Sequence, residues 1–465
     1  MRLEKEYKKS GYFWLPEQQE KKIAGTLVIH DGGKIELETV DSFDKSYTES
    51  FDLDNIPRII GNVESDGYVT LDDCFYIEKN VLFGGIGKSK IIVNKVYKGV
   101  AYDKDEEVTF NTLLFSVDCL DEWIGISGFT NKYYPDLKTS KVSYTQPENI
   151  YLQLDNGMEL EICFSAKFPL GSKVSKIEIV QTVSFKLKSE ILRPLNDFTE
   201  LMYKLTNFMC FAIDDIVSIK DVSATTVELQ KKVGKEKQHP ISIYIYFESR
   251  PYSTKIPKKS WHNMLFTFGI IKDNAQDIFN NWLNAYEVIS PAIGLYFSTQ
   301  IDGYKFLEGK FLALAQGLET YHRRTSNEKL MDENDFKLLI KNIIKNSPEK
   351  HKEWLEKRLK YGNEISLAKR LQQIIEPFKA KFGNHDNRKM IIRKIVDTRN
   401  YFTHYDEDLK DQAVTKGNKL YVLCEIMEVT FQLHFLKVIG FSDKEIDNVI
   451  ENNYLFKQKL EDLKL

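Results

Sequence analysis

The chain has 465 residues, of which 42% are hydrophobic and 29% are charged. This length exceeds what a single ordinary hydrophobic core needs, so we expect two or three domains. No apolar run approaches the ~18 residues of a membrane-spanning helix, and the charged start at residues 1–9 lacks the apolar stretch of a signal peptide. We therefore expect a cytoplasmic protein with no membrane partner.

The net charge of -3 is unevenly distributed along the sequence. From Lys305 onward there are 30 Lys and Arg residues against 25 Asp and Glu residues, whereas the part before it has 35 against 43. The C-terminal part is therefore basic and the front is acidic. A basic excess has the right sign for contact with phosphates, although helical domains of other functions share it.

Cysteine and histidine spacing shows no metal-binding or redox motif. The five cysteines lie far apart without a C-x-x-C pair, and we expect all five to be buried thiols. The eight histidines form neither H-x-x-x-H nor H-E-x-x-H, and no G-x-S-x-G motif is present. The segment Gly84–Ser89 ends in Gly-Lys-Ser but lacks the first glycine of a phosphate-binding loop, so we interpret it as a turn. We expect no cofactor and no metal.

Residues 1–190 show the alternation of apolar and polar residues that is typical of β-strands. Two hairpins are predicted around Asx-Gly turns, one pairing 26–30 with 34–38 and the other pairing 151–154 with 159–162. Further strands are predicted at 90–93, 113–117, 177–180 and 241–247. Many short strands indicate a sandwich or an open barrel, so we predict a β-rich N-terminal domain over 1–190.

A strong helix is predicted from Phe198 to Ala212, where apolar residues recur every three or four positions behind the capping pair Asp197 and Glu200. A second helical pattern begins at Ile278 and is predicted to stop near Pro291, because proline disrupts a helix interior. Together with the strand at 241–247, these elements predict a bridging helix plus a second mixed α/β part over 191–300.

Strand patterns vanish in the C-terminal part of the sequence. Helices are predicted there at 305–324, 335–346, 348–361, 365–382, 387–404, 417–439 and 443–460. Short connections between long amphipathic helices are typical of an up-and-down bundle. The predicted class is thus α+β multidomain, with a β-rich N-terminal half, an inserted helix and an all-α helical bundle over 301–465.

The helix predicted at 387–404 ends in Arg399-Asn400-Tyr401-Phe402-Thr403-His404. At about 100° per residue, Asn400 and His404 share a face, whereas Arg399 lies about 140° from His404. One copy therefore separates its cation from its imidazole. If two bundles pair around this helix, each Arg399 can reach the other copy's histidine, which predicts a site shared between two chains.

These residue types suit cleavage of RNA by its own 2′-hydroxyl. Histidine titrates near neutral pH and can serve as a general base or acid, and arginine offers a fixed fork of N–H donors to phosphate oxygens. This chemistry requires no metal. An arginine and a histidine at this spacing also arise by chance, and a histidine at a helix end is commonly a surface or capping residue.

The motif, its helix and the all-helical tail resemble the HEPN superfamily, whose signature is an arginine, a polar residue, about three variable residues and a histidine. More closely, residues 310–323 and 395–404 resemble the HEPN domain of ApeA-type anti-phage proteins of bacteria. The N-terminal domain that accompanies it is similar to this sequence at residues 11–16, 24–27, 59–61 and 69–71.

This resemblance implies a metal-independent endoribonuclease of abortive infection that acts as a homodimer or higher homo-oligomer, with Arg399 and His404 catalytic and Asn400 orienting the site. Glu319 lies in a family-like segment and is a secondary candidate. The N-terminal half would sense a phage-derived trigger or restrain the nuclease. The alternatives are a non-catalytic HEPN module that dimerises or binds nucleic acid, with a β-rich ligand-binding domain, and a carbohydrate-binding β protein with a helical oligomerisation tail.

Overall fold

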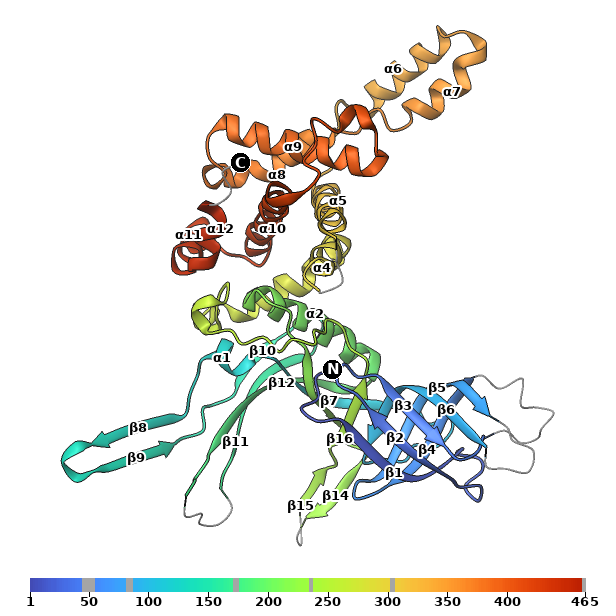
Figure 1. Cartoon of the computed structure of the whole chain (residues 1–465), viewed down its shortest axis with the longest axis vertical. Helices are drawn as coiled ribbons and strands as arrows, with labels where there is room; N and C mark the ends of the chain where they lie inside the picture. Colours follow the sequence, from blue (N-terminus) through green and yellow to red (C-terminus); the bar gives the residue numbers. More distant parts are fainter. Residues whose placement is uncertain (44–54, 81–86, 170–174, 234–236, 302–305, 462–465) are drawn as a thin grey trace. The chain divides into compact units, whose positions relative to one another are not determined.

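The computed structural model describes residues 1–43, 55–80, 87–169, 175–233, 237–301 and 306–461 (Figure 1). The chain divides into two compact units, Met1–Asn280 and Asn281–Leu465. The first is rich in strands and the second is helical, which confirms the predicted α+β class. Most of the Gly-rich stretch before Gly-Lys-Ser lies outside the described residues.

Six strands of the first unit close into an antiparallel barrel. They are β1 (Tyr7–Trp14), β2 (Ile23–Ile29), β3 (Ile35–Thr39), β4 (Asn55–Val63), β5 (Gly67–Asn80) and β6 (Lys88–Lys98). The hydrogen-bonded order is β6-β3-β2-β1-β4-β5, and β5 pairs in turn with β6, so this part of the sheet closes on itself. Closure pairs the strands that would be the edges of an open barrel. The β-rich prediction is thus confirmed, in the form of a closed barrel.

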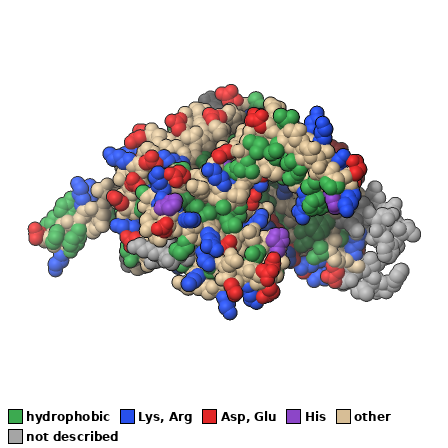
Figure 2. All heavy atoms as spheres, turned by 90° about the horizontal axis from the view of Figure 1, so that it is seen from above, with side chains coloured by type: hydrophobic (Ala, Val, Ile, Leu, Met, Phe, Trp, Pro, Cys, Tyr) green, Lys and Arg blue, Asp and Glu red, His purple; other side chains and the backbone are tan. Residues whose placement is uncertain are grey.

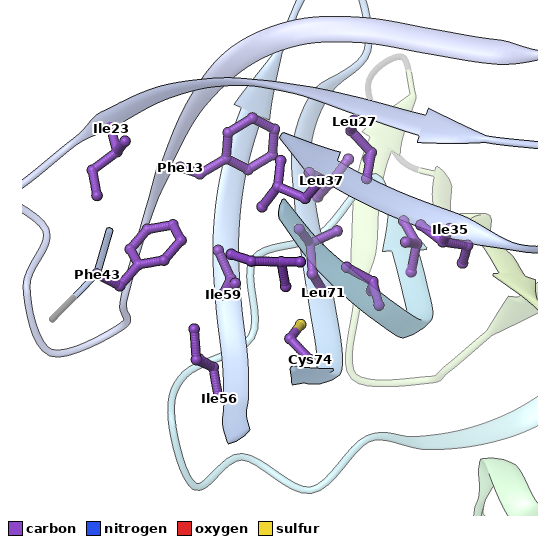
Figure 3. Packing of buried hydrophobic residues seen from close by; sticks show 14 of the residues in the cluster. Phe13, Ile23, Leu27, Ile35, Leu37, Phe43, Ile56, Ile59, Leu71 and Cys74 are labelled. Carbon is purple, nitrogen blue, oxygen red and sulfur yellow. The ribbon is translucent and has the colours of Figure 1, made fainter. Parts of the chain in front are cut away.

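The inward side chains of these strands form one continuous apolar core (Figure 3). Phe13, Leu27, Leu37 and Leu71 are fully buried in it, as strand alternation predicts. Gly61 lies directly against the ring of Phe13, and a Cβ atom at this position would lie only 2.6 Å from that ring. The close approach therefore requires glycine.

The remaining strands of the main sheet continue from β6. In order they are β16 (Ile243–Phe247), β13 (Ile219–Thr225), β7 (Thr109–Val117), β12 (Val180–Pro194), β11 (Glu159–Lys167) and β10 (Ile150–Gln153). Both predicted hairpins are confirmed by their register, in which Ile29 pairs with Ile35 and Gln153 pairs with Glu159. The strand predicted at 177–180 is wrong, because pairing with β11 starts only at Val180.

The predicted helix at 198–212 is confirmed as α2 (Leu195–Ile213), which contacts β7 and β12. Trp123 of α1 (Leu120–Ile124) packs edge-on against Phe208 of α2 and donates its indole N–H to the carbonyl of Phe266 at 2.9 Å. Short elements complete this unit: β8 (Phe129–Tyr134), η1 (Pro135–Leu137), β9 (Thr139–Tyr144), β14 (Gln230–Val233), β15 (Lys237–Pro240), η2 (Trp261–Asn263) and α3 (Phe268–Ile271). Aromatic packing thus ties α1 and α2 together.

The helical unit is built around α10 (Gly417–Val438), which is buried on nearly all sides from Ile426 to Leu436. Burial all round a helix marks a central element, and α5 (Leu307–Thr325) packs along it. The other elements are α6 (Glu333–Lys345), α7 (Glu349–Leu359), α8 (Leu367–Ile375), η3 (Glu376–Lys381), α9 (His385–His404), η4 (Glu407–Leu409), α11 (Asp443–Asn452) and α12 (Tyr454–Glu461). Helices α6 and α7 pack on each other and bury no residue. The predicted helices at 365–382 and 443–460 are each divided in two.

Helix α4 (Ala275–Ser298) corrects the predicted helix end near Pro291. Its backbone leaves helical angles at Ile289, where φ is -115° and ψ is 15°. Helix then resumes with Pro291 near its new start, where the missing N–H of proline would have no helical partner in any case. The proline therefore kinks the helix and does not end it.

His434 of α10 is buried among aromatic rings in the helical core. Its Nε2 atom lies 2.8 Å from the carbonyl oxygen of Ile374, to which it donates, and its ring contacts Tyr321 and Phe378. Burial lowers the pKa of His434 from 6.5 to about 4. The neutral imidazole is therefore the form that the fold accommodates.

We predict that the protein loses stability in mild acid because of this histidine. A histidine whose pKa is lower in the folded state than in the unfolded state contributes its full stability above about pH 6.5. That contribution falls as the pH drops from about 6.5 to about 4, by up to roughly 3 kcal/mol. Urea unfolding at pH 7 and pH 5 should show a smaller pH effect in His434→Phe than in the wild type. An equal effect in both proteins would contradict this assignment.

Candidate active site

Helix α9 carries the predicted motif at its C-terminal end. The helix begins after Asn384, whose side chain accepts a hydrogen bond from the N–H of Asn387 at 2.9 Å. It ends where Tyr405 adopts a left-handed conformation with φ 50°, and the Tyr405 N–H donates to the carbonyl of Tyr401. The motif therefore occupies a helix end whose position is fixed by local hydrogen bonding.

The buried side of α9 holds this end against the bundle. Phe402 packs edge-on against Phe311 of α5, with ring centroids 5.9 Å apart. Thr398 is fully buried, and its hydroxyl oxygen accepts the N–H of Val414 at 2.9 Å. With these side chains packed inward, helical geometry directs the polar residues of the motif outward.

Arg399, Asn400 and His404 lie at the surface of this helix end. The guanidinium of Arg399 donates to Asn400 Oδ1 at 3.3 Å, and 36% of its side chain is exposed. The His404 side chain is exposed, and it has no hydrogen-bond or ion-pair partner among the described residues. Arg399 and His404 form no such contact with each other within the chain. The structure therefore brings the cation and the amide together and leaves the imidazole apart.

Glu319 of α5 faces Arg399. Its Oε2 atom lies 3.6 Å from Arg399 Nη2, which is an ion pair beyond hydrogen-bond length. Its Oε1 atom accepts two hydrogen bonds from Arg323, at 3.0 and 3.2 Å. Arg323 was not identified as a candidate from the sequence, although the i,i+4 spacing of Glu319 and Arg323 on a helix is a recognisable signal for this pair.

Glu364, just before α8, joins the same cluster and was not found from the sequence. Its Oε2 atom accepts hydrogen bonds from Arg323 at 2.7 Å and from Arg370 at 2.6 Å, and its Oε1 atom accepts one from Lys329 at 2.5 Å. No local pattern could reveal this, because Glu364 and Arg323 are 41 positions apart. Cations outnumber carboxylates in the cluster, a balance that favours contact with phosphate oxygens.

Charge on the face of the molecule drawn in Figure 2 is mixed in sign. Blue Lys and Arg side chains lie between red Asp and Glu side chains, and neither sign covers that face broadly. Attraction for a polyanion at this face would therefore come from local groups of cations.

Two of the five cysteines are not buried, contrary to the expectation from the sequence. Cys74, Cys210 and Cys424 are buried as predicted, but Cys119 and Cys163 are only half-buried. Cys163 projects from β11 on the face opposite to its buried neighbours Ile162 and Phe164, because successive strand residues alternate. Burial raises the pKa of Cys163 and of Cys424 to about 12, so both are protonated at neutral pH.

Among the residues that the structure describes, no three His, Cys, Asp or Glu side chains converge as ligands for a metal ion. Likewise, no described helix is both long enough and apolar enough to cross a membrane.

The chain has a strand-rich unit followed by a helical unit, and the helical unit carries R-N-x-x-x-H at an exposed helix end. These features define a HEPN-type protein with an N-terminal β domain. Residues 8–282 match the ApeA N-terminal domain 1, and residues 312–445 match the Apea-like HEPN domain. The first match spans more than half of the chain, which therefore belongs to the ApeA family. HEPN domains are generally nucleases, and the matched segment contains Glu319, Arg399 and His404. No curated protein and no solved structure matches the chain.

We predict that the two sides of α9 differ in their tolerance to substitution. Thr398→Val leaves the buried N–H of Val414 without an acceptor, which should cost about 1–3 kcal/mol of folding free energy. His404→Ala removes an exposed side chain without a described polar partner, so the change should stay below about 1 kcal/mol. Urea unfolding of the full chain measures both. A larger loss in His404→Ala than in Thr398→Val would show that His404 has a structural role.

Proposed function

We propose that this chain is a metal-independent endoribonuclease effector of bacterial anti-phage defence, acting by abortive infection and cutting RNA through Arg399 and His404 at a dimer interface. The observation that carries the proposal is the R-N-x-x-x-H motif at the exposed end of α9, inside the segment that matches the Apea-like HEPN domain. Membership of the ApeA family supports the anti-phage role. The N-terminal unit would sense a phage-derived trigger or restrain the nuclease. Because the proposed substrate is RNA, the protein would act in the cytoplasm.

The proposed reaction uses the 2′-hydroxyl of the RNA as nucleophile. His404 takes the hydroxyl proton while the 2′-oxygen attacks the adjacent phosphorus. The bond from phosphorus to the 5′-oxygen breaks, and the imidazolium formed on His404 gives that oxygen the proton. Arg399 donates N–H groups to the phosphate oxygens as negative charge develops on them. The products are a 2′,3′-cyclic phosphate and a 5′-hydroxyl.

The dimer is supported by how the motif residues lie on one helix. Arg399 and His404 point about 140° apart, since each residue advances about 100° around a helix. Asn400 contacts the Arg399 guanidinium at 3.3 Å and would orient it. In a pair of chains arranged around α9, each Arg399 would face the partner's His404, which supplies the imidazole that its own chain holds apart.

We predict that the protein cleaves RNA in EDTA and leaves 2′,3′-cyclic phosphate ends, because the proposed groups supply the base, the acid and the charge. His404→Ala should abolish cleavage. His385→Ala is the matched control, because His385 is an exposed histidine at the opposite end of the same helix. RNA integrity in expressing cells and end-group analysis with purified protein are the measurements. Cleavage that stops in EDTA and returns with Mg²⁺ would overturn the mechanism, and cleavage by His404→Ala would overturn the catalytic role.

We also predict that two inactive variants rescue each other when mixed. If each site combines Arg399 of one chain with His404 of the partner subunit, an Arg399→Ala chain paired with a His404→Ala chain keeps one site with both groups. Half of the dimers in an equal mixture are mixed, so at most about a quarter of wild-type activity should return. The controls are each variant alone and each variant mixed with a chain that carries both Arg399→Ala and His404→Ala. No rescue in a mixture that has exchanged subunits would indicate sites contained within one chain.

A further inference from the structure

Arg399 lies at one end of a chain of charged groups within the helical unit. Glu319 faces it at 3.6 Å. Arg323 then links two carboxylates, because its Nε and Nη2 atoms donate to Glu319 while its Nη1 atom donates to Glu364 at 2.7 Å. The order Arg399, Glu319, Arg323, Glu364 alternates in sign, so each group attracts the next.

The far end of this chain of charges is anchored in the protein interior. Arg370, only 2% exposed, donates to Glu364 at 2.6 Å and to His322 Nδ1 at 3.1 Å. Burial lowers the pKa of His322, so the ring is neutral and its second nitrogen donates to Gln373 Oε1. Glu364 is thus anchored by one guanidinium, that of Arg370, which has little freedom to move.

The backbone that carries Glu364 is also fixed. Glu364 forms a β-bridge with Lys329, and the carbonyl of Asn363 accepts the N–H of Leu330 at 3.0 Å. The Asn363 side chain bonds to both the N–H and the carbonyl of Met331, each at 3.0 Å. The linkers on either side of the α6–α7 pair are therefore joined at the position from which Glu364 extends.

The ionic state of Glu364 suits this role. The Lys329 ammonium, at 2.5 Å, lowers the pKa of the Glu364 carboxyl group, so the group stays ionised at neutral pH. Isolated exposed ion pairs contribute little, but here one carboxylate binds three cations and one guanidinium binds two carboxylates. A connected network restrains its members more than separate pairs do.

We propose that Arg323 and Glu364 are positioning residues, which hold Glu319 and through it direct the Arg399 guanidinium toward a phosphate of the RNA. The inference rests on the proposed function. A surface arginine without such a restraint samples many rotamers, and ordering it costs entropy. Glu319 restrains Arg399 from 3.6 Å without a hydrogen bond, and so leaves most of the five N–H donors of Arg399 for the substrate.

The experiment is steady-state RNA cleavage by the full chain with Glu364→Gln and with Arg323→Lys. Both should lower kcat about tenfold or more, because a guanidinium displaced by about an ångström stabilises the reacting phosphate poorly. RNA binding, measured by fluorescence anisotropy in a His404→Ala background, should stay within about twofold, since positioning acts during reaction. Arg323→Lys keeps the charge of an exposed side chain but cannot bridge two carboxylates. It therefore tests the positioning role even if Glu364→Gln folds poorly.

Glu376→Gln is the matched control, because Glu376 forms an exposed ion pair with Lys379 at 2.8 Å outside this network. It should cleave at the wild-type rate. Glu319→Gln combined with Glu364→Gln should be no slower than Glu319→Gln alone, because the two carboxylates act in series. Losses that multiply, or wild-type kcat in a folded Arg323→Lys protein, overturn the positioning role alone. Absence of cleavage by wild type and control overturns the proposed function and this inference with it.

Discussion

An α-helix advances about 100° per residue, and this period limits what the end of α9 can present to a substrate. Between Arg399 and His404 lie Tyr401 and Phe402, which are buried against the bundle. Rotating the helix about its axis would not change the angle of about 140° between Arg399 and His404, and it would expose these aromatic rings, at a cost of roughly 1.5–3 kcal/mol for each. The helical period therefore holds the two polar groups apart, and the packing fixes which side of the helix carries them. A second chain is the arrangement that would reunite them without loss of core packing.

A shared site of this kind would have an electrostatic cost, which the cluster around Glu319 would reduce. Two Arg399 side chains brought to one interface repel each other. A carboxylate hydrogen-bonded to each would remove the repulsion but would also occupy the donors that a phosphate needs. At 3.6 Å, Glu319 offsets charge while forming no hydrogen bond to Arg399. Its other oxygen is taken up by Arg323, which keeps it from closing that distance.

Sequence patterns predicted those features whose causes lie within a few residues. The hairpin from β2 to β3 follows from its Asp-Gly turn, and α2 follows from apolar spacing and a capping pair. What could not be predicted depends on partners far along the chain. The start of β12 is set by its pairing with β11, and the barrel closes because β5 pairs with β6. The half-buried state of Cys163 depends on how the sheet packs. At the site, the motif spacing identified Arg399, Asn400 and His404 as candidates, and their catalytic roles are still predictions. Glu364 could not be identified in this way, because only the folded chain brings it next to Arg323.

The histidines of the helical unit show how position determines which chemistry a residue type can perform. His322 uses both ring nitrogens on protein groups, and His434 donates to the carbonyl of Ile374 from a site enclosed by aromatic rings. Burial lowers the pKa of both, so neither is suited to take up a proton near neutral pH. His404 lies in solvent with no described hydrogen-bond partner, and its ring nitrogens can therefore meet a substrate directly. General acid and base catalysis requires an imidazole within hydrogen-bond reach of the reacting group, and an exposed position at the end of a helix gives His404 that access.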